Sequence, residues 1–523
     1  MTRAAISIAV CLMLLSSCSS STEPTLSGAS ASAAVVPTQP VNLDRHCDLA
    51  PFPSADWISC ELANFARTGE GPAEQLSVAF QQRFTEQSLF NLQEWTARAT
   101  ADPSWLDPRS GNTVVLPLCA TWGLQCTGDP FRYPDVAGPD GATFYEQEAQ
   151  VTPILFYDDE CTRLSGHVWL PKGAAPGVKL PNIVFANGSI QAPETVYWWL
   201  IQPLVRAGYA VLTYDPRGQG RSDQQAPNFD QGSNLNGEIF WNEQVNAIDF
   251  MHSTPDRPYP HNISCAGTYP TPTTPFNPIW NRIDVERLGI AGHSAGAISS
   301  SIVQGYGAPD ADPWPGVMDG ANPVKVAVAL DSAIASDASG FAPVNDYSLP
   351  QDVYDLFVLL LNRGRPIPKF APRVPMLSFN ADYGLAPVPY LTPPNVDGHK
   401  IAFAEWQAAG LPAYVIGLQG TTHFDYSLLP TFPTTSWCPD TSTGACTGGW
   451  ARPAVVKYTL AWFDRWLKLP GETGYADADT RLLDDGGPEG AVKMSFHFHS
   501  ARDFPDHGGH SHHCEDIRAG CTE

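Results

Sequence analysis

Apolar positions follow two periods from about residue 145 onward. Short, almost wholly apolar runs bounded by turn residues predict strands, and longer stretches with apolar residues three or four apart predict helices. Eight strands are predicted, at 154–157, 167–170, 182–185, 210–214, 288–291, 324–330, 376–379 and 414–417. The clearest helices between or after them span 196–207, 238–252 and 453–467.

This alternation predicts an α/β protein. Strands that are apolar on both faces need cover on both faces, so we expect a mostly parallel eight-stranded sheet with helices on either side. The runs at 154–157 and 167–170 are expected to pair antiparallel at the start of the sheet. Functional groups in such folds lie in loops beyond the carboxyl ends of the strands.

The remaining segments divide around this core. We expect a signal peptide at 1–17, a lipidated cysteine with a flexible tether at 18–45, an N-terminal extension at 46–144, the catalytic domain at 145–470 and a C-terminal tail at 471–523. A helix is predicted near 78–99 of the extension. The pattern assigns the extension no chemistry.

The first residues have the build of an export signal. Arg3 precedes an apolar stretch at 4–15 that is too short to span a membrane. The stretch ends in Leu-Ser-Ser-Cys, with the cysteine at position 18. This ending resembles the lipobox of bacterial lipoproteins, in which the signal is cut before a cysteine that carries acyl chains. The resemblance predicts a cell-envelope lipoprotein anchored through Cys18 to a membrane outside the cytoplasm; the alternative is an ordinary secretory signal.

Cysteine usage agrees with export. The chain has 12 cysteines, and setting aside Cys11 in the signal and Cys18 leaves an even number. An even set in an exported chain indicates a disulfide framework. Zinc ligation is the alternative, but no paired Cys-x-x-Cys spacing is present. The expected pairs are Cys47 with Cys60, Cys119 with Cys126, Cys161 with Cys265, Cys438 with Cys446, and Cys514 with Cys521.

Charge excludes one class of partner. The 523 residues carry 30 Lys and Arg against 54 Asp and Glu, a net charge of −24. Such a chain offers no basic surface for phosphates, which argues against a nucleic-acid partner.

One loop carries candidate chemistry. It follows the strand at 288–291 and is made of Gly292, His293, Ser294, Ala295 and Gly296. A Gly-x-Ser-x-Gly sequence between a strand and a helix fits the nucleophile elbow, where small residues let the two backbones approach closely. The pattern therefore predicts Ser294 as a nucleophile.

A serine nucleophile needs a general base oriented by an acid, in the chain order Ser, acid, His for this elbow. His423 follows the strand at 414–417 and is the expected base. Asp382, after the strand at 376–379, is the expected acid. Asp331, which closes the strand at 324–330, is the alternative, with turn capping as its ordinary role.

Two backbone N–H groups are expected to bind the oxyanion. The first belongs to Ala295, directly after the nucleophile. The second is expected from Ser189, in the loop after the strand at 182–185, with Ile190 as the alternative.

Four motifs together resemble a known family. They are the Asp-x-Arg-Gly-x-Gly-x-Ser loop at 215–222, the GHSAG elbow, the Ala-Asp segment ending in Leu-Ala-Pro at 381–387, and Gly-Thr-Thr-His-Phe at 420–424. The region 145–470 resembles serine α/β-hydrolases and is similar to secreted bacterial esterases and cutinase-like hydrolases. The resemblance implies the α/β-hydrolase fold and cleavage of a small or lipid-like carboxylic ester through an acyl-enzyme, without a cofactor.

Other functions stay open at this point. The triad residues are also compatible with an amidase or peptidase of the same fold, and with a lipoprotein that binds a ligand or metal without turnover. The tail is rich in histidine, after a strand expected at 494–498. We expect a solvated tail closed by Cys514 and Cys521 rather than a zinc or copper site. Its histidines are His497, His499, His507, His510, His512 and His513.

Overall fold

The computed structural model describes the part of the chain that forms one compact unit within residues 39–523. The described residues are 43–69, 78, 93, 95–112, 144–175, 177–189, 193–230, 232, 236–340, 350–353, 355–356, 362–385, 387–427 and 450–521.

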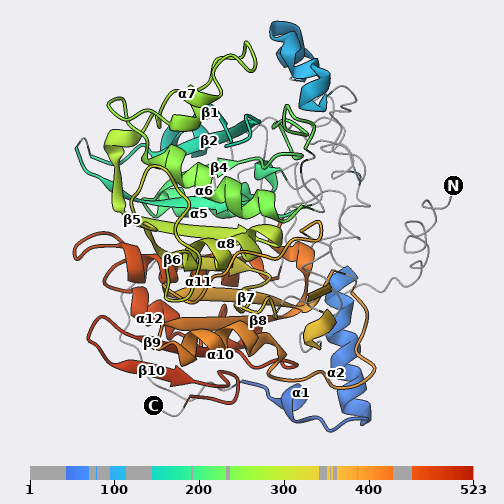
Figure 1. Ribbon diagram of the computed structural model, residues 1–523. Coiled ribbons are helices and arrows are strands. Elements are labelled where there is room, and N and C mark those ends of the chain that lie inside the picture. The colour runs from blue at the N-terminus through green and yellow to red at the C-terminus, as the bar shows by residue number, and fades with distance from the viewer. Residues whose placement is uncertain are drawn as a thin grey trace, which may run out of the picture. The chain divides into compact units, whose positions relative to one another are not determined.

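The described chain is built on a ten-stranded sheet in the order β1-β2-β4-β3-β5-β6-β7-β8-β9-β10 (Figure 1). The eight predicted strands all form; β4 and β6 have the predicted bounds, and the other six are longer than their apolar runs. The strands are β1 Ala149–Tyr157, β2 Arg163–Pro171, β3 Leu180–Ala186, β4 Ala210–Tyr214, β5 Ile283–His293, β6 Val324–Leu330, β7 Met376–Tyr383, β8 Ala413–Thr422, β9 Ala501–Pro505 and β10 Ser511–Cys514.

The sheet is mixed, and the expectation of eight strands was wrong. The six central strands, β4 to β8 in sheet order, pair parallel. Antiparallel strands β1 and β2 extend one edge, as expected, and β9 and β10 extend the other. The last two strands contain no apolar run, because polar residues interrupt them: Arg502, Asp503, Ser511, His512 and His513.

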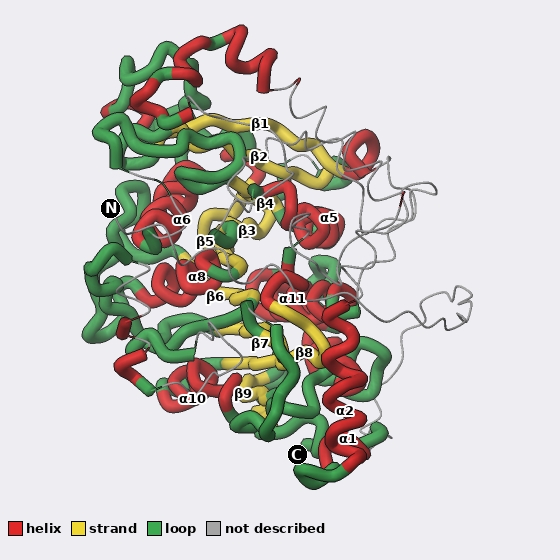
Figure 2. Tube along the Cα trace, turned by 90° about the vertical axis from the view of Figure 1, so that its right-hand side faces the viewer, coloured by secondary structure: helices red, strands yellow, loops and turns green. Residues whose placement is uncertain are grey.

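Helices cover both faces of the sheet (Figure 2). On one face, α5 Trp198–Arg206 and α11 Arg452–Leu467 pack on side chains such as Ile183. On the other, α6 Glu238–His252, α8 Ala295–Gly305 and α10 Ile401–Ala408 pack on neighbours such as Val184. Successive strand residues point to opposite faces, which is why residues 183–186 of β3 are all apolar. None of the helices in the described ranges is long and apolar enough to cross a membrane.

Further helices lie outside these two layers. They are α1 His46–Leu49, α2 Ala55–Ala66, α7 Pro260–Ser264 and α12 Ala478–Leu482. The 3-10 turns are η1 Arg67–Gly69, η2 Pro103–Leu106, η3 Pro108–Ser110, η7 Glu194–Tyr197, η8 Trp280–Arg282, η9 Gly398–Lys400, η10 His423–Tyr426 and η11 Ala491–Lys493, and η6 Phe144–Glu148 is a π-helix.

The N-terminal extension packs against the far half of the sheet. Helix α2 begins after Ser54, whose side chain accepts the N–H of Trp57, and lies beside β7 and β8 (Figure 1). Early and late parts of the sequence are therefore in direct contact.

Of the helix predicted at 78–99, residues 95–101 are helical, and most of the rest lies outside the described residues.

The C-terminal tail joins the sheet instead of standing apart. Its strand β9 pairs with β8, and β10 pairs with β9. The strand expected at 494–498 does not form; only Met494 makes a bridge, to Leu418. The chain bends after Met494 because Ser495 accepts the N–H groups of His497 and Phe498.

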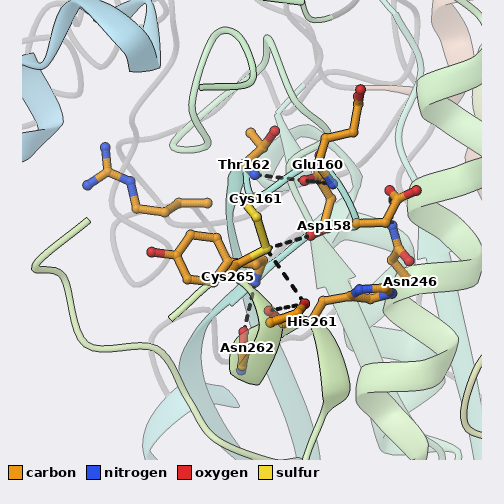
Figure 3. Close-up of a disulfide and its surroundings, with 12 residues drawn as sticks. Asp158, Glu160, Cys161, Thr162, Asn246, His261, Asn262 and Cys265 are labelled. Carbon is orange, nitrogen blue, oxygen red and sulfur yellow. Dashed lines mark hydrogen bonds between the residues drawn. A yellow bond between two sulfur atoms is a disulfide. The ribbon is translucent and has the colours of Figure 1, made fainter. Parts of the chain in front are cut away.

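Three of the five expected disulfides are present: Cys47–Cys60, Cys161–Cys265 and Cys514–Cys521. The other two expected pairs, Cys119–Cys126 and Cys438–Cys446, lie outside the described residues. Figure 3 shows Cys161 and Cys265 beside Asp158, whose carboxylate accepts the N–H of Thr162 at 2.7 Å.

These bonds close loops of very different length, 104 residues for Cys161–Cys265 and 7 for Cys514–Cys521. In the chain-entropy description the longer loop gives about 2 kcal/mol more stability. We expect Cys161→Ala/Cys265→Ala to lower the free energy of unfolding more than Cys514→Ala/Cys521→Ala, measured by urea denaturation. A larger loss in the second variant would contradict this assignment, and free thiols in non-reducing peptide maps would contradict the pairing.

Candidate active site

The loop after β5 has the geometry of the predicted elbow. Ser294 joins β5 to α8 with φ 57° and ψ −119°, a conformation that L-residues rarely adopt. A Cβ at Gly292 would lie 2.2 Å from the Gly296 carbonyl oxygen, and one at Gly296 would lie 2.2 Å from the Ala186 carbonyl oxygen. The backbones of β5, α8 and β3 thus meet where only glycine fits.

Ser294, His423 and Asp331 form a continuous hydrogen-bonded chain. The Nδ1 atom of His423 lies 2.7 Å from Asp331 Oδ2, and its Nε2 atom lies 2.8 Å from Ser294 Oγ. A carboxylate only accepts, so Nδ1 carries the proton and the neutral ring accepts the Ser294 hydroxyl proton at Nε2. All three residues are buried, with Ser294 8% exposed. The imidazole is therefore held as a base toward Ser294.

The carboxylate on His423 belongs to Asp331, the alternative, and the expectation of Asp382 is corrected. Strand β7 runs on to Tyr383, so Asp382 is still within the strand, whereas β6 ends at Leu330 and leaves Asp331 in the loop beyond it. The N–H of Ala381 donates to the other oxygen of Asp331 at 2.9 Å. Asp331 is thereby fixed by β7 while it faces His423.

Asp382 holds a different part of the structure. Its Oδ2 accepts the N–H of Gly420 at 2.9 Å and the side-chain amide of Asn64 at 2.7 Å. Burial raises the pKa of this carboxyl. Gly420 has φ +68° and lies three residues before His423. Asp382 thus ties the turn that leads to His423 to helix α2.

A second buried carboxylate extends this contact. Glu61 of α2 accepts the hydroxyl of Tyr383 at 3.1 Å and the N–H of Tyr390 at 2.6 Å, and it also contacts the Nε2 atom of His497. The N-terminal extension and the tail therefore meet at the end of β7 through ionisable side chains that no motif indicated.

A further hydrogen-bonded chain, which we call the Tyr197–His293 strut, joins three loops of the site. The Nε2 atom of His293 lies 2.8 Å from the carbonyl oxygen of His423, so that nitrogen carries the proton. Its Nδ1 atom, 2.9 Å from Tyr197 Oη, accepts the Tyr197 hydroxyl proton. Tyr197 Oη in turn accepts the N–H of Gly188 at 2.9 Å. The strut thus connects the loop after β3, the elbow and the loop of His423.

The loop after β3 lies against the serine. A Cβ at Gly188 would be 3.1 Å from Ser294 Cβ, and Gln219 donates to the Gly188 carbonyl at 2.9 Å. Ser189 follows and is half-buried, while Ile190 lies outside the described residues. Ala295 is the first residue of α8, so its N–H has no acceptor within the helix.

Several site residues were missed at the sequence level. Tyr197, Asn64 and Glu61 lie in segments with no catalytic motif, and nothing in their local pattern marks them. His293 was identified only as part of the elbow. Asp331 carried a usable signal, its place directly after an apolar strand, but Asp382 carried a similar one.

The tail histidines contact carboxylates, and His510 and His512 share Asp506. Other examples are His507 with Asp479 and His499 with Asp397. Across the described ranges, no group of three or more His, Cys, Asp or Glu residues is arranged to hold a metal ion. Cys18 lies outside these ranges.

Comparisons with known proteins give only distant likenesses. No protein-family model and no curated protein matches the chain. Among solved structures it is similar to an acylaminoacyl peptidase of Pyrococcus horikoshii (13% identity, TM-score 0.37, covering 64% of this chain and 45% of that one). It is also similar to vibralactone cyclase (12% identity, TM-score 0.35, covering 53% of this chain and 74% of that one). A third likeness is to a point mutant of the esterase rPPE (14% identity, TM-score 0.34, covering 55% of this chain and 77% of that one). The chain spans less than half of the peptidase's length.

The strut makes stability depend on pH. Burial, and next the electrostatic interaction with the His423 imidazole, lower the pKa of His293 to about 3, against about 6.5 for an unfolded histidine. Between pH 3 and pH 6.5, both approximate, the unfolded chain binds about one more proton than the folded chain. The stability gained by keeping His293 neutral is therefore complete above pH ~6.5 and is lost as pH falls toward 3.

From pH 7 to pH 5, we expect the wild-type protein to lose about 2 kcal/mol more free energy of unfolding than His293→Gln, because only the wild type must keep this ring neutral. Urea denaturation at both pH values measures the difference. Equal losses in the two proteins would show that His293 is protonated readily in the fold.

Proposed function

We propose that this protein is a serine hydrolase that cleaves carboxylic esters. The observation that carries the proposal is the unbroken chain from Ser294 Oγ through His423 to Asp331, on an elbow that positions the serine at the end of a central parallel strand. Serine is a weak nucleophile until a base within hydrogen-bond distance takes its proton, and here that base is in place.

The reaction follows from this geometry. His423 Nε2 takes the hydroxyl proton while Ser294 Oγ attacks the ester carbonyl carbon, and the tetrahedral intermediate carries its negative charge on the former carbonyl oxygen. His423 then gives the proton to the leaving alcohol, which leaves an acyl-enzyme. A water molecule, deprotonated by His423, attacks the acyl-enzyme, and collapse returns the proton to Ser294 and releases the acid. Asp331 keeps the imidazole in the required tautomer throughout.

The N–H groups of Ala295 and Ser189 are the proposed oxyanion donors. Ala295 supplies a helix N–H free of an intrahelical acceptor. The N–H of Gly188 is already donated to Tyr197, which favours Ser189 as the second donor. The strut is then a positioning element, since it links this loop to the carbonyl of His423.

The α/β-hydrolase fold is part of the proposal. Its support is a parallel centre in the order β4-β3-β5-β6-β7-β8, helices on both faces, and the loops after β5, β6 and β8 carrying Ser294, Asp331 and His423. The motif resemblance of region 145–470 agrees with it.

We also propose that the protein is exported and anchored by Cys18. The disulfides at Cys47–Cys60, Cys161–Cys265 and Cys514–Cys521 favour an oxidising compartment, and the lipobox-like ending at 15–18 favours lipidation. Amide cleavage is the second candidate, since the same triad geometry serves both reactions.

The proposal is tested with aryl esters of increasing acyl length and a matched anilide. We expect ester hydrolysis in the wild type, labelling of Ser294 by a fluorophosphonate, and a loss of kcat on the order of 10⁶-fold in Ser294→Ala. Ser299→Ala is the matched control, because Ser299 lies in the same helix and bonds Phe240 and Gln244. Absence of both turnover and labelling in the wild type would reject the enzyme, and faster anilide cleavage would favour the amidase.

The two carboxylates are separated by a matched pair of variants. Asp331→Asn is expected to lower kcat by about 10⁴-fold with little change in KM, because the base is held in the wrong tautomer. Asp382→Asn is expected to keep kcat within about tenfold and to lose about 1–3 kcal/mol of stability through its buried hydrogen bonds. Kinetics and thermal unfolding of both proteins check this, and a larger loss of kcat in Asp382→Asn would reverse the assignment.

A further inference from the structure

A cavity whose lining includes none of Ser294, His423 and Asp331 lies between the helical residues 95–101 and strands β1 and β2. It has a volume of about 520 Å³. Ligand pockets in proteins commonly have this size. Its lining includes Trp95 and Arg98 of the helix, Ile154 and Leu155 of β1, and Ser165 and His167 of β2.

The cation of Arg98 is the unusual group in this cavity. Its guanidinium donates to the Arg221 carbonyl oxygen at 2.9 Å and to Ser165 Oγ at 2.8 Å, and it stacks on Trp105. It forms no ion pair with a carboxylate of the described residues. Burial and the nearby charge of Arg221 lower its pKa to about 9. A partly buried guanidinium without a carboxylate partner favours an incoming anion.

The nearest carboxylates are already committed. Asp223 makes a bidentate pair with Arg163, at 2.9 Å to each of two guanidinium nitrogens. Asp215 accepts the N–H groups of Glu194 at 2.6 Å and Arg221 at 2.8 Å. Neither carboxylate bonds the Arg98 guanidinium, so the cavity keeps a positive wall.

His167 also lines the cavity. Its Nδ1 atom lies 2.6 Å from Glu194 Oε1, and Glu194 also accepts the hydroxyl of Thr213. The carboxylate fixes the Nδ1 proton, as Asp331 does for His423, and gives the ring one orientation. The lining also includes the apolar side chains of Trp95, Ile154 and Leu155. A carboxylate with an attached hydrocarbon chain complements this combination of polar and apolar groups.

We propose that this cavity is a second binding site, which takes a monocarboxylate with an apolar chain and holds its carboxylate on Arg98 and Ser165. The site goes beyond ester hydrolysis at Ser294 and does not depend on it. Ligand binding in the cavity would affect the catalytic loops through turn η7. This turn carries both Glu194, which contacts His167, and Tyr197 of the strut.

Octanoate is the probe, titrated into the full chain with Ser294→Ala so that turnover plays no part. Isothermal calorimetry and tryptophan fluorescence are expected to show saturable binding, with Trp95 as a reporter in the cavity wall. Octanamide, which has the same chain without charge, should bind at least tenfold more weakly, because a charge-assisted hydrogen bond contributes about 1.5–3 kcal/mol.

Two variants in this background locate the ligand. Arg98→Gln should weaken octanoate binding at least tenfold, and Ala97→Phe should abolish it by filling the cavity from an exposed helix position. Arg365→Gln is the charge-matched control, since Arg365 pairs with Glu238 at the surface and lies outside the lining. Ala97→Phe removes no contact of Arg98, so it keeps the test valid if Arg98→Gln unfolds.

Each contrary result overturns the proposal. The first is the absence of saturable octanoate binding, and the second is equal affinity for octanoate and octanamide. The third is octanoate binding that neither cavity variant changes, which would place octanoate elsewhere, such as at Ser294. A loss of thermal stability in Arg98→Gln with unchanged affinity would make Arg98 a packing residue only. Ester hydrolysis is measured separately in the parent protein, so failure here leaves that function untouched.

Discussion

The contact of three backbones at Gly292 and Gly296 is the constraint on which the rest of the site depends. β5, α8 and β3 approach so closely there that a Cβ at either glycine would overlap a carbonyl oxygen. The approach forces Ser294 into its positive φ and aims its side chain at His423. It also brings the loop of Gly188 against the serine. The sheet therefore sets the position of Ser294, and the other residues of the site are arranged around it.

Segments far from the elbow in sequence hold the other partners. Asp382 and Asn64 tie the turn at Gly420 to α2, and a Cβ on Gly420 would meet the side chain of Arg67. Glu61 brings His497 of the tail to the same place. We infer that the extension and the tail act as supports for the loop that carries His423. The buried contacts of Asp382 with Asn64 and of Glu61 with His497 explain why these additions fold as part of one unit.

Much of the fold was predictable because burial leaves a mark on the sequence. The eight apolar runs and the helix at 238–252 were found because strands covered on both faces, and helices packed on them, need regular apolar positions. β9 and β10 were missed because they are short strands at the edge of the sheet, in which polar side chains interrupt the apolar ones. Ser294 and His423 were predicted from a motif and from chain order, and the structure brings them together.

The acid was not predictable in the same way. Asp331 and Asp382 both follow apolar runs and both lie between Ser294 and His423 in the chain, so order alone does not separate them. The deciding fact is where β7 ends, and its apolar run stops four residues before Tyr383, its last residue. The strut and the Asp382 contacts depend on tertiary packing between distant segments, which leaves no local pattern.

The assignment of the triad depends on Asp331 accepting the Nδ1–H of His423 in a hydrogen bond. Proton NMR of the protein with ¹⁵N-labelled histidine measures this directly, through a far-downfield Nδ1–H resonance. We predict that this resonance is present in the wild type and in Asp382→Ala and absent in Asp331→Ala. Its persistence in Asp331→Ala and its loss in Asp382→Ala would contradict the account.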